Sequence, residues 1–264
     1  MIERMGKRLR RQRPRSQASF WTQQYGGMPV WGVAGASAFL AIVAAVAVPS
    51  ILDRPSPTSA SELRPVEWTL TERPPVAVFF GDSYTTGAGS KKGGYVTAIA
   101  REQKWSSRNL ARGGTGFIPN PDQTVEQART ACGADYCESF IEQIPAAVKI
   151  DPEIVVVNGG RNGVGANPDV LRESIGAFFE ELRVQLPDAT IYVTSPLWQD
   201  ETAPDELNDL AEWERAAAES VDATFLDLGQ PLEGRPDLIG PDKVHPNEEG
   251  YQVLAASINA GLSR

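Results

Sequence analysis

The segment Val76–Tyr84, VAVFFGDSY, decides how this sequence of 264 residues folds. It begins with five apolar residues in a row, and the apolar run ends at Gly81. A continuous apolar run of this length, bounded by glycine, is typical of a β-strand that is buried on both faces. Such strands lie inside parallel sheets, where functional loops follow the carboxyl ends of the strands. The polar residues after Gly81 therefore stand where a functional site is expected.

Strand patterns and helical patterns alternate from this segment to the C-terminus. Further strands are expected at 107–111, 154–158, 190–194 and 224–228, and helices at 95–103, 139–148, 170–185, 205–221 and from Asn247 onward. Pro145 is expected to interrupt the second of these helices or to offset its start. This alternation predicts a mostly parallel, five-stranded sheet covered by helices on both faces.

Charge is distributed unevenly along the chain. The first 15 residues contain seven basic residues and one acidic residue, which leaves 18 of 25 basic and 33 of 34 acidic residues for the rest, a net charge of −15. Binding to nucleic acid requires a clustered basic face. The acidic body therefore argues against nucleic acid as a partner.

An uncharged run of 19 residues, 30–48, follows the basic arm at 1–29. At about 1.5 Å per residue, a helix of this length spans the ~30 Å hydrocarbon core of a membrane. The basic flank predicts a single-pass anchor with a cytoplasmic N-terminus, which places the residues after the anchor outside the cytoplasm. A cleaved signal peptide, with a site at Ala45-Val46-Ala47, is the alternative and predicts a secreted body. A buried core helix is a third possibility.

The rest of the chain divides into a linker and one domain. Residues 49–75 are rich in proline, which disfavours helix and sheet, and residues 76–264 form the expected domain. Cys132 and Cys137 are the two cysteines, and export favours a disulfide between them over two free thiols. A metal site would need more ligands than this chain offers around them. The sequence sets no expectation for the oligomeric state.

Three residues, Ser83, His245 and Asp242, suggest nucleophilic catalysis. Ser83 directly follows the first strand, and a serine hydroxyl becomes a good nucleophile only when a base removes its proton. His245 is the only histidine in the chain, so it is the only imidazole that can act as this base. Asp242, three residues earlier, can orient the imidazole through Nδ1.

Acyl transfer also needs N–H donors for the oxygen that becomes negative in the transition state. Two segments at predicted strand ends offer them: the glycine-rich Asn109–Gly116, and Gly160–Gly163 with the side-chain amide of Asn162. Neither segment matches a phosphate-binding loop, which would end in Gly-Lys-Ser/Thr. Taken alone, either glycine cluster is equally consistent with an ordinary turn.

Together these segments resemble the sequence blocks of the SGNH hydrolases, also called GDSL-type esterases and lipases. The matching segments are Gly81–Tyr84, Asn109–Gly116, Gly160–Asn162 and Asp242–His245. Their order and spacing cover most of residues 76–264. The resemblance implies a three-layer α/β/α sandwich of the flavodoxin-like SGNH type and a carboxylic ester hydrolase that needs no cofactor.

The resemblance also assigns roles to particular residues. It implies a triad of Ser83, Asp242 and His245, and an oxyanion hole formed by the Ser83 and Gly114 backbone N–H groups with the Asn162 side chain. Gly113 remains an alternative donor to Gly114.

The chain departs from the family pattern at two positions. Tyr84 replaces the usual leucine, and Gly163 stands where the third block commonly has aspartate. Support for the Asn162 loop must therefore come from elsewhere. Thr85 excludes the Gly-x-Ser-x-Gly turn of the α/β-hydrolases.

The expected substrate is a small-molecule, lipid or glycan ester. An O-acyltransferase or a cell-wall glycan O-deacetylase with the same triad is the main alternative, and a non-catalytic binding module is a weaker one. Trp198, Phe117 and Ile118 are candidates for an acyl pocket, although apolar residues at strand ends also pack as core.

Overall fold

The computed structural model describes residues 24–25, 28–29 and 73–263, and the chain divides into two units, Met1–Leu70 and Thr71–Arg264. In the first unit, β1 (Gln24–Tyr25) and β2 (Met28–Pro29) pair antiparallel, which the sequence did not predict. The expected membrane segment at 30–48 lies outside the described residues, as do most of the basic arm and the linker. None of the helices within the described ranges is long and apolar enough to cross a membrane.

The second unit is built on a parallel sheet of five strands in the order β4-β3-β5-β6-β7. These strands are β3 (Val76–Gly81), β4 (Ser106–Asn109), β5 (Ile154–Asn158), β6 (Thr190–Thr194) and β7 (Thr224–Leu226). The predicted number and direction of strands are confirmed. Because the strands are parallel, their carboxyl ends meet at one edge of the sheet.

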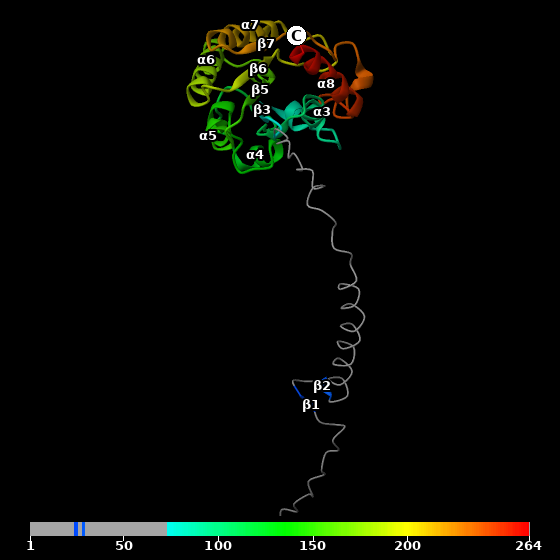
Figure 1. Cartoon of the computed structure of the whole chain (residues 1–264). Helices are drawn as coiled ribbons and strands as arrows, with labels where there is room; N and C mark the ends of the chain where they lie inside the picture. The colour runs from blue at the N-terminus through cyan, green and yellow to red at the C-terminus, as the bar shows by residue number, and fades with distance from the viewer. Residues whose placement is uncertain (1–23, 26–27, 30–72, 264) are drawn as a thin grey trace, which may run out of the picture. The chain divides into compact units, whose positions relative to one another are not determined.

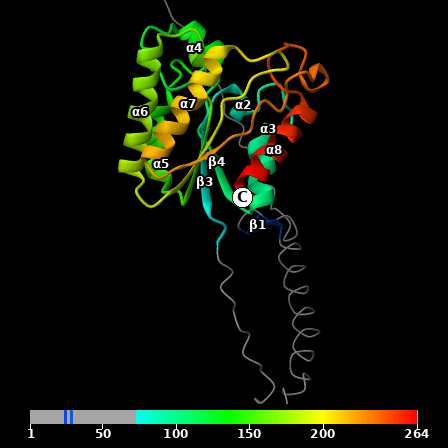
Figure 2. The same ribbon diagram turned by 90° about the horizontal axis from the view of Figure 1, so that it is seen from above.

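Helices cover both faces of the sheet (Figures 1 and 2). On one face lie α3 (Gly94–Gln103) and α8 (Glu248–Leu262), and on the other lie α5 (Phe140–Ile150), α6 (Pro168–Gln185) and α7 (Asp205–Ser220). Two short helices, α2 (Ser83–Thr86) and α4 (Val125–Ala131), complete a three-layer α/β/α sandwich with seven α-helices among the described residues.

The alternation of side chains along β3 shows why its whole apolar run is buried. Val78 and Phe80 belong to the core cluster beneath α5, α6 and α7, whereas Ala77 and Phe79 belong to the cluster beneath α3 and α8. Burial of each large apolar side chain contributes about 1.5–3 kcal/mol. Both faces of this strand therefore anchor the segment that follows it.

An aromatic cluster holds the loop after β4 against the core. Phe117 lies in this loop, and its ring centroid is 4.9 Å from that of Phe140 and 5.5 Å from that of Phe178. The rings meet edge to face, the arrangement that aromatic quadrupoles favour. The residues just before Phe117 thereby acquire a fixed position.

The expectation that Pro145 would interrupt or offset its helix was wrong. Helix α5 begins at Phe140 and continues through Pro145 to Ile150. Ser139 and Glu142 form a capping box at its start. Proline removes one helical hydrogen bond, but Phe140 and Ile144 are buried on the same helix, and their packing holds the helix together.

Candidate active site

Ser83 is the first residue of the short helix α2, directly after β3. The Asp82 side chain caps this helix, with Oδ1 accepting a hydrogen bond of 2.9 Å from the Tyr84 N–H. Gly81 is required before it, because a Cβ there would lie 1.9 Å from Thr85 Oγ1. Among the described residues the Ser83 N–H donates no hydrogen bond, as expected at a helix N-terminus.

Asp242 and His245 form a hydrogen-bonded pair in the loop before α8. Asp242 Oδ2 lies 2.7 Å from His245 Nδ1, and Asp242 Oδ1 accepts the backbone N–H groups of Val244 and His245 at 3.0 Å each. Burial raises the pKa of Asp242, but the hydrogen bonds from His245 and Val244 outweigh it and lower that pKa to about 2. The carboxylate is therefore ionised at neutral pH, so Nδ1 carries the proton of a neutral imidazole and leaves Nε2 as the basic nitrogen.

Tyr84 joins the Ser83 turn to the His245 loop, which lies 160 residues away in the sequence. Its hydroxyl donates a hydrogen bond of 2.6 Å to the Val244 carbonyl, and its ring centroid lies 5.9 Å from that of His245. A second bond between the same regions runs from the Tyr251 hydroxyl to the Ala88 carbonyl at 2.7 Å. The Ser83 turn and the bonded Asp242–His245 pair thus lie at the same edge of the sheet, although the Ser83 side chain makes no hydrogen bond to His245 among the described residues.

The glycine-rich loop after β4 is also tied to the Ser83 turn. Asn109 Nδ2 donates to the Thr85 carbonyl at 2.8 Å, and the Arg112 N–H donates to the Gly81 carbonyl at 3.0 Å. Gly114 has a φ of +70°, in the left-handed region that favours glycine. Its N–H donates to no other residue between 73 and 263, so it is free to bind a ligand.

Gly113 and Gly114 differ in what they face. Gly113 packs against α4, because a Cβ there would lie 2.1 Å from the Ala131 carbonyl oxygen. Gly114 also borders α4, since a Cβ there would lie 3.1 Å from Ala131 Cβ, but it lines a cavity together with Asn162, which Gly113 does not. This difference favours Gly114 over Gly113 as the backbone donor.

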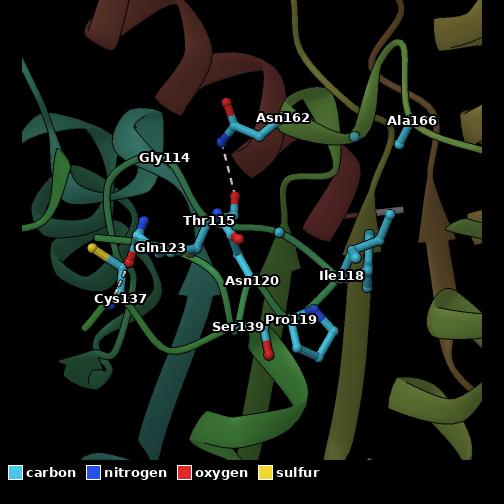
Figure 3. Close-up of a pocket in the computed structure, with 13 residues that line it drawn as sticks. Gly114, Thr115, Ile118, Pro119, Asn120, Gln123, Cys137, Ser139, Asn162 and Ala166 are labelled. Atoms are coloured by element: carbon cyan, nitrogen blue, oxygen red, sulfur yellow. Dashed lines mark hydrogen bonds between the residues drawn. The ribbon is translucent and has the colours of Figure 1, made fainter. Parts of the chain in front are cut away.

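Asn162 lies in a 3₁₀ turn, η2 (Arg161–Gly163), that follows β5. Its Nδ2 donates a hydrogen bond of 2.8 Å to the Thr115 carbonyl (Figure 3). Thr115 is itself fixed, since its Oγ1 donates to the Arg112 carbonyl at 2.9 Å. A side-chain amide has two N–H groups, so Asn162 keeps one for a ligand while the other sets its orientation.

The cavity beside Gly114 and Asn162 has a volume of about 260 Å³ (Figure 3). Phe117, Ile118 and Pro119 contribute apolar surface to it, and Asn120 and Gln123 contribute polar groups. Two of the three candidates for an acyl pocket, Phe117 and Ile118, therefore line this cavity. Trp198 does not line it and stacks on Arg161 instead, with Arg161 Cζ 4.5 Å from the indole ring.

A disulfide between Cys132 and Cys137 stands at the wall of the cavity. Cys137 is buried and lines the cavity, and its N–H donates to Gln123 Oε1 at 2.9 Å. Helix α4 precedes the first cysteine and was not predicted. The signal for α4 is a capping box of Thr124 and Gln127 before a short helical stretch.

A buried polar network lies beneath the site and was also not predicted. The Tyr95 hydroxyl contacts Thr85 Oγ1 and donates to Asn158 Oδ1 at 2.8 Å, and Asn158 Nδ2 donates to Thr194 Oγ1. All four side chains are buried. A satisfied network of this kind fixes the relative positions of α2, β5 and β6.

Two buried carboxyl groups lie behind the Ser83 turn. Burial raises the pKa of Asp82 to about 6, although the Tyr84 N–H, Arg161 and His245 oppose this change. Burial also raises the pKa of Glu214 on α7 well above its ordinary value, with a further contribution from Asp82. Glu214 Oε1 has no hydrogen-bond partner among the described residues. Burial and the nearby Asp82 therefore both favour the protonated form of Glu214.

The raised pKa of Asp82 predicts a pH-dependent stability. Its ordinary pKa is 3.8, so wild-type protein should lose stability relative to Asp82→Asn as the pH rises from 4 to 8, by up to about 3 kcal/mol. Asparagine can still accept the Tyr84 N–H and cap the helix. Urea unfolding of both proteins at pH 4, 6 and 8 measures this difference; a constant difference across the series would show that Asp82 does not titrate as described.

No group of three or more His, Cys, Asp or Glu side chains that could hold a metal ion occurs within the described part of the chain. The arrangement instead places a hydroxyl, an oriented imidazole and free N–H donors at one edge of the sheet. Such an arrangement suits acyl transfer.

Comparisons with known proteins agree with this chemistry. Residues 79–253 match the GDSL-like lipase/acylhydrolase family. A GDSL lipase of Mycobacterium tuberculosis is 30% identical over 191 residues, which cover 70% of this chain and 79% of that protein.

Two solved structures share the fold at low identity. A putative GDSL-like lipase from Parabacteroides merdae has a TM-score of 0.53 at 15% identity. The match covers 72% of this chain and 96% of the lipase chain. An acetyl xylan esterase from Butyrivibrio proteoclasticus has a TM-score of 0.51 at 18% identity. The match covers 71% of this chain and 63% of the esterase chain. The chain belongs to the GDSL-like lipase/acylhydrolase family and is a carboxylic ester hydrolase.

Proposed function

We propose that this protein hydrolyses carboxylic esters through an acyl-enzyme on Ser83, with His245 as the base and Asp242 as its orienting carboxylate. The observation that carries the proposal is the bond of 2.7 Å between Asp242 Oδ2 and His245 Nδ1, in a loop that Tyr84 joins to the Ser83 turn. The ionised Asp242 holds the imidazole in the tautomer that can accept a proton at Nε2.

The reaction proceeds in two halves. Ser83 Oγ attacks the ester carbonyl carbon while His245 Nε2 takes the hydroxyl proton. The tetrahedral intermediate then expels the alcohol, which receives that proton from His245, and the acyl group remains on Ser83. Water attacks the acyl-enzyme in the same way, gives a proton to His245, and releases the carboxylic acid as the proton returns to Ser83 Oγ.

Three donors stabilise the oxyanion in both halves. They are the backbone N–H groups of Ser83 and Gly114 and the second N–H of the Asn162 amide. The first two donate to no other described residue, and the third belongs to an amide already oriented by the Thr115 carbonyl. Donors that are fixed before the reaction need no reorganisation when the charge develops.

The cavity supports a substrate with a short acyl group. It is lined by the proposed oxyanion donors Gly114 and Asn162, but not by Ser83, Asp242 or His245, and it holds about 260 Å³. This is smaller than the roughly 300–1,000 Å³ of most ligand pockets, and its polar groups, such as Asn120 and Gln123, suit a hydrated substrate more than a long hydrocarbon chain. The name of the acetyl xylan esterase relative is consistent with a short acyl group on a sugar.

The cavity predicts an acyl-length preference. With p-nitrophenyl esters, kcat/KM for the acetyl and butyryl esters should exceed that for the palmitoyl ester by about 10-fold or more, because the longer chain would leave much of its apolar surface in water. A length series on the full chain measures this. A maximum at 16 carbons would contradict a short-acyl substrate.

Hydrolysis and transfer can be separated in one assay. Incubation with an acetyl ester and a xylo-oligosaccharide should give free acetate in amounts equal to the alcohol released. Acetylated sugar as the main product would favour the O-acyltransferase alternative, and deacetylation of an acetylated glycan faster than of the simple ester would favour the glycan O-deacetylase. Absence of turnover on every ester would contradict the proposal itself.

We further propose that the catalytic domain works outside the cytoplasm. The basic residues before position 16, the uncharged run at 30–48 and the bonded cysteine pair Cys132–Cys137 support this location. The linker at 49–75 would then separate a membrane anchor from the hydrolase domain at 76–264. Cleavage after Ala47 would instead release the domain.

A further inference from the structure

Arg161 contacts two aromatic rings beside the Ser83 turn, those of Tyr84 and Trp198. Its Cζ lies 4.6 Å from the centroid of the Tyr84 ring and 4.5 Å from that of the Trp198 ring. Its Nη2 donates a hydrogen bond of 2.6 Å to Gln199 Oε1. A planar guanidinium can stack on both rings at once, and an ammonium group cannot.

The position of Arg161 links three catalytic segments. It directly precedes Asn162 in η2, and Tyr84 directly follows Ser83. The Tyr84 hydroxyl in turn bonds to the Val244 carbonyl beside His245. A rigid contact between Arg161 and Tyr84 therefore sets the distance between the Asn162 amide and the nucleophile.

The loop has few other side-chain restraints. Gly163 contributes none, and Leu171 fills the space where its side chain would lie, since a Cβ there would be 2.9 Å from Leu171 Cδ1. Apart from the bond of Arg161 to Gln199, the bond from Asn162 to Thr115 is the only side-chain hydrogen bond that this turn makes within the described residues. Arg161 Nη1 is buried and has no hydrogen-bond partner among the described residues.

We propose that Arg161 is a positioning residue that acts through Asn162, by clamping the turn Arg161–Gly163 against Tyr84 and Trp198 so that the amide reaches the oxyanion. This inference rests on the proposed function of Ser83 and Asn162. It also explains how the turn is held although Gly163 stands in place of an acidic side chain.

The proposed positioning role of Arg161 predicts that its replacement lowers kcat with little change in KM. Arg161→Met and Arg161→Lys should each lower kcat for p-nitrophenyl acetate by about 10- to 100-fold, since displacement of a catalytic group by about 1 Å costs up to about 100-fold. The KM should stay within about twofold, because the proposed role of Arg161 is to position Asn162 and not to bind the substrate. Lysine keeps the charge but should not restore activity.

A matched control uses Arg215, another arginine that stacks on an aromatic ring. Arg215 on α7 lies 4.3 Å from the Phe225 ring and pairs with Asp227 at 3.1 Å. Arg215→Met removes the same kind of contact away from the site and should keep wild-type kcat. Thermal unfolding of all variants shows whether they are folded.

A double-variant comparison separates positioning from general destabilisation. If Arg161 acts through Asn162, then Arg161→Met combined with Asn162→Ala should be no more than about twofold slower than Asn162→Ala alone. If the losses in kcat caused by Arg161→Met and Asn162→Ala instead multiply in the double variant, the inference is overturned. If Arg161→Met does not fold, Trp198→Leu replaces it, with an expected loss in kcat of about 3- to 10-fold and the same lack of additivity.

The outcome also distinguishes this inference from the proposed function. If wild-type protein does not react with a phosphonate at Ser83, the proposed function fails. If wild-type protein reacts, but Arg161→Lys and Trp198→Leu both keep wild-type kcat, only the role of Arg161 is overturned.

Discussion

Ser83→Ala is expected to lower kcat for p-nitrophenyl acetate by about 10⁴-fold or more and to abolish the acyl-enzyme. Alanine removes the hydroxyl that forms the new ester bond, while the oxyanion donors remain and account for the residual rate. The fold should not change, because Asp82 still caps α2 through its bond to the Tyr84 N–H. Stopped-flow release of p-nitrophenol, followed by mass analysis of the acid-quenched protein, measures both effects.

Ser220→Ala is the matched control for this variant. Ser220 is exposed at the end of α7, and within residues 73–263 its hydroxyl bonds only to the nearby Ala217 carbonyl. This variant should keep wild-type kcat and wild-type acylation. If Ser83→Ala retains an acylated species at the wild-type amplitude, another residue is the nucleophile.

His245→Ala is expected to reduce kcat by a similar factor, about 10⁴-fold or more. The chain contains no other histidine, so no second imidazole can replace the lost base. Asp242 cannot take over this role near neutral pH, because a carboxyl group is a weak base even at the ordinary aspartate pKa of 3.8. Initial rates from pH 5 to 9 measure the loss at each pH.

The neighbouring Lys243→Gly variant tests whether the loss follows from the imidazole or from the loop. Lys243 has a φ of 59°, a conformation that glycine adopts readily, so this variant should preserve the loop and keep wild-type activity. Ester hydrolysis by His245→Ala within tenfold of wild type would exclude the proposed triad.

Much of the fold was predictable because its strands and long helices carry regular patterns. The strand at 190–194 has the predicted bounds, and Asn247 caps the final helix as expected, with Oδ1 accepting the Glu249 and Gly250 N–H groups. These features depend on residues close in sequence. The path of α5 through Pro145 was not predictable, because tertiary packing of Phe140 and Ile144 decides it.

The candidate site residues could be proposed from the sequence because each bears a chemically distinctive group. Ser83 directly follows a predicted strand, and Asp242 and His245 come just before the predicted final helix. The contacts of Arg161 with Tyr84 and Trp198 were not, since they join three loops and leave no local pattern. The burial of Glu214 could not be predicted either, because a glutamate on an amphipathic helix normally faces water.

Fluorophosphonate labelling of the full chain tests the central claim most directly. The reagent forms a covalent bond only with a serine that is activated within an oxyanion site, and mass spectrometry of the digested protein locates the adduct. We predict one adduct, on Ser83, that is absent from Ser83→Ala and strongly slowed in His245→Ala. An adduct on a different residue, or labelling of Ser83→Ala at the wild-type rate, would contradict this account.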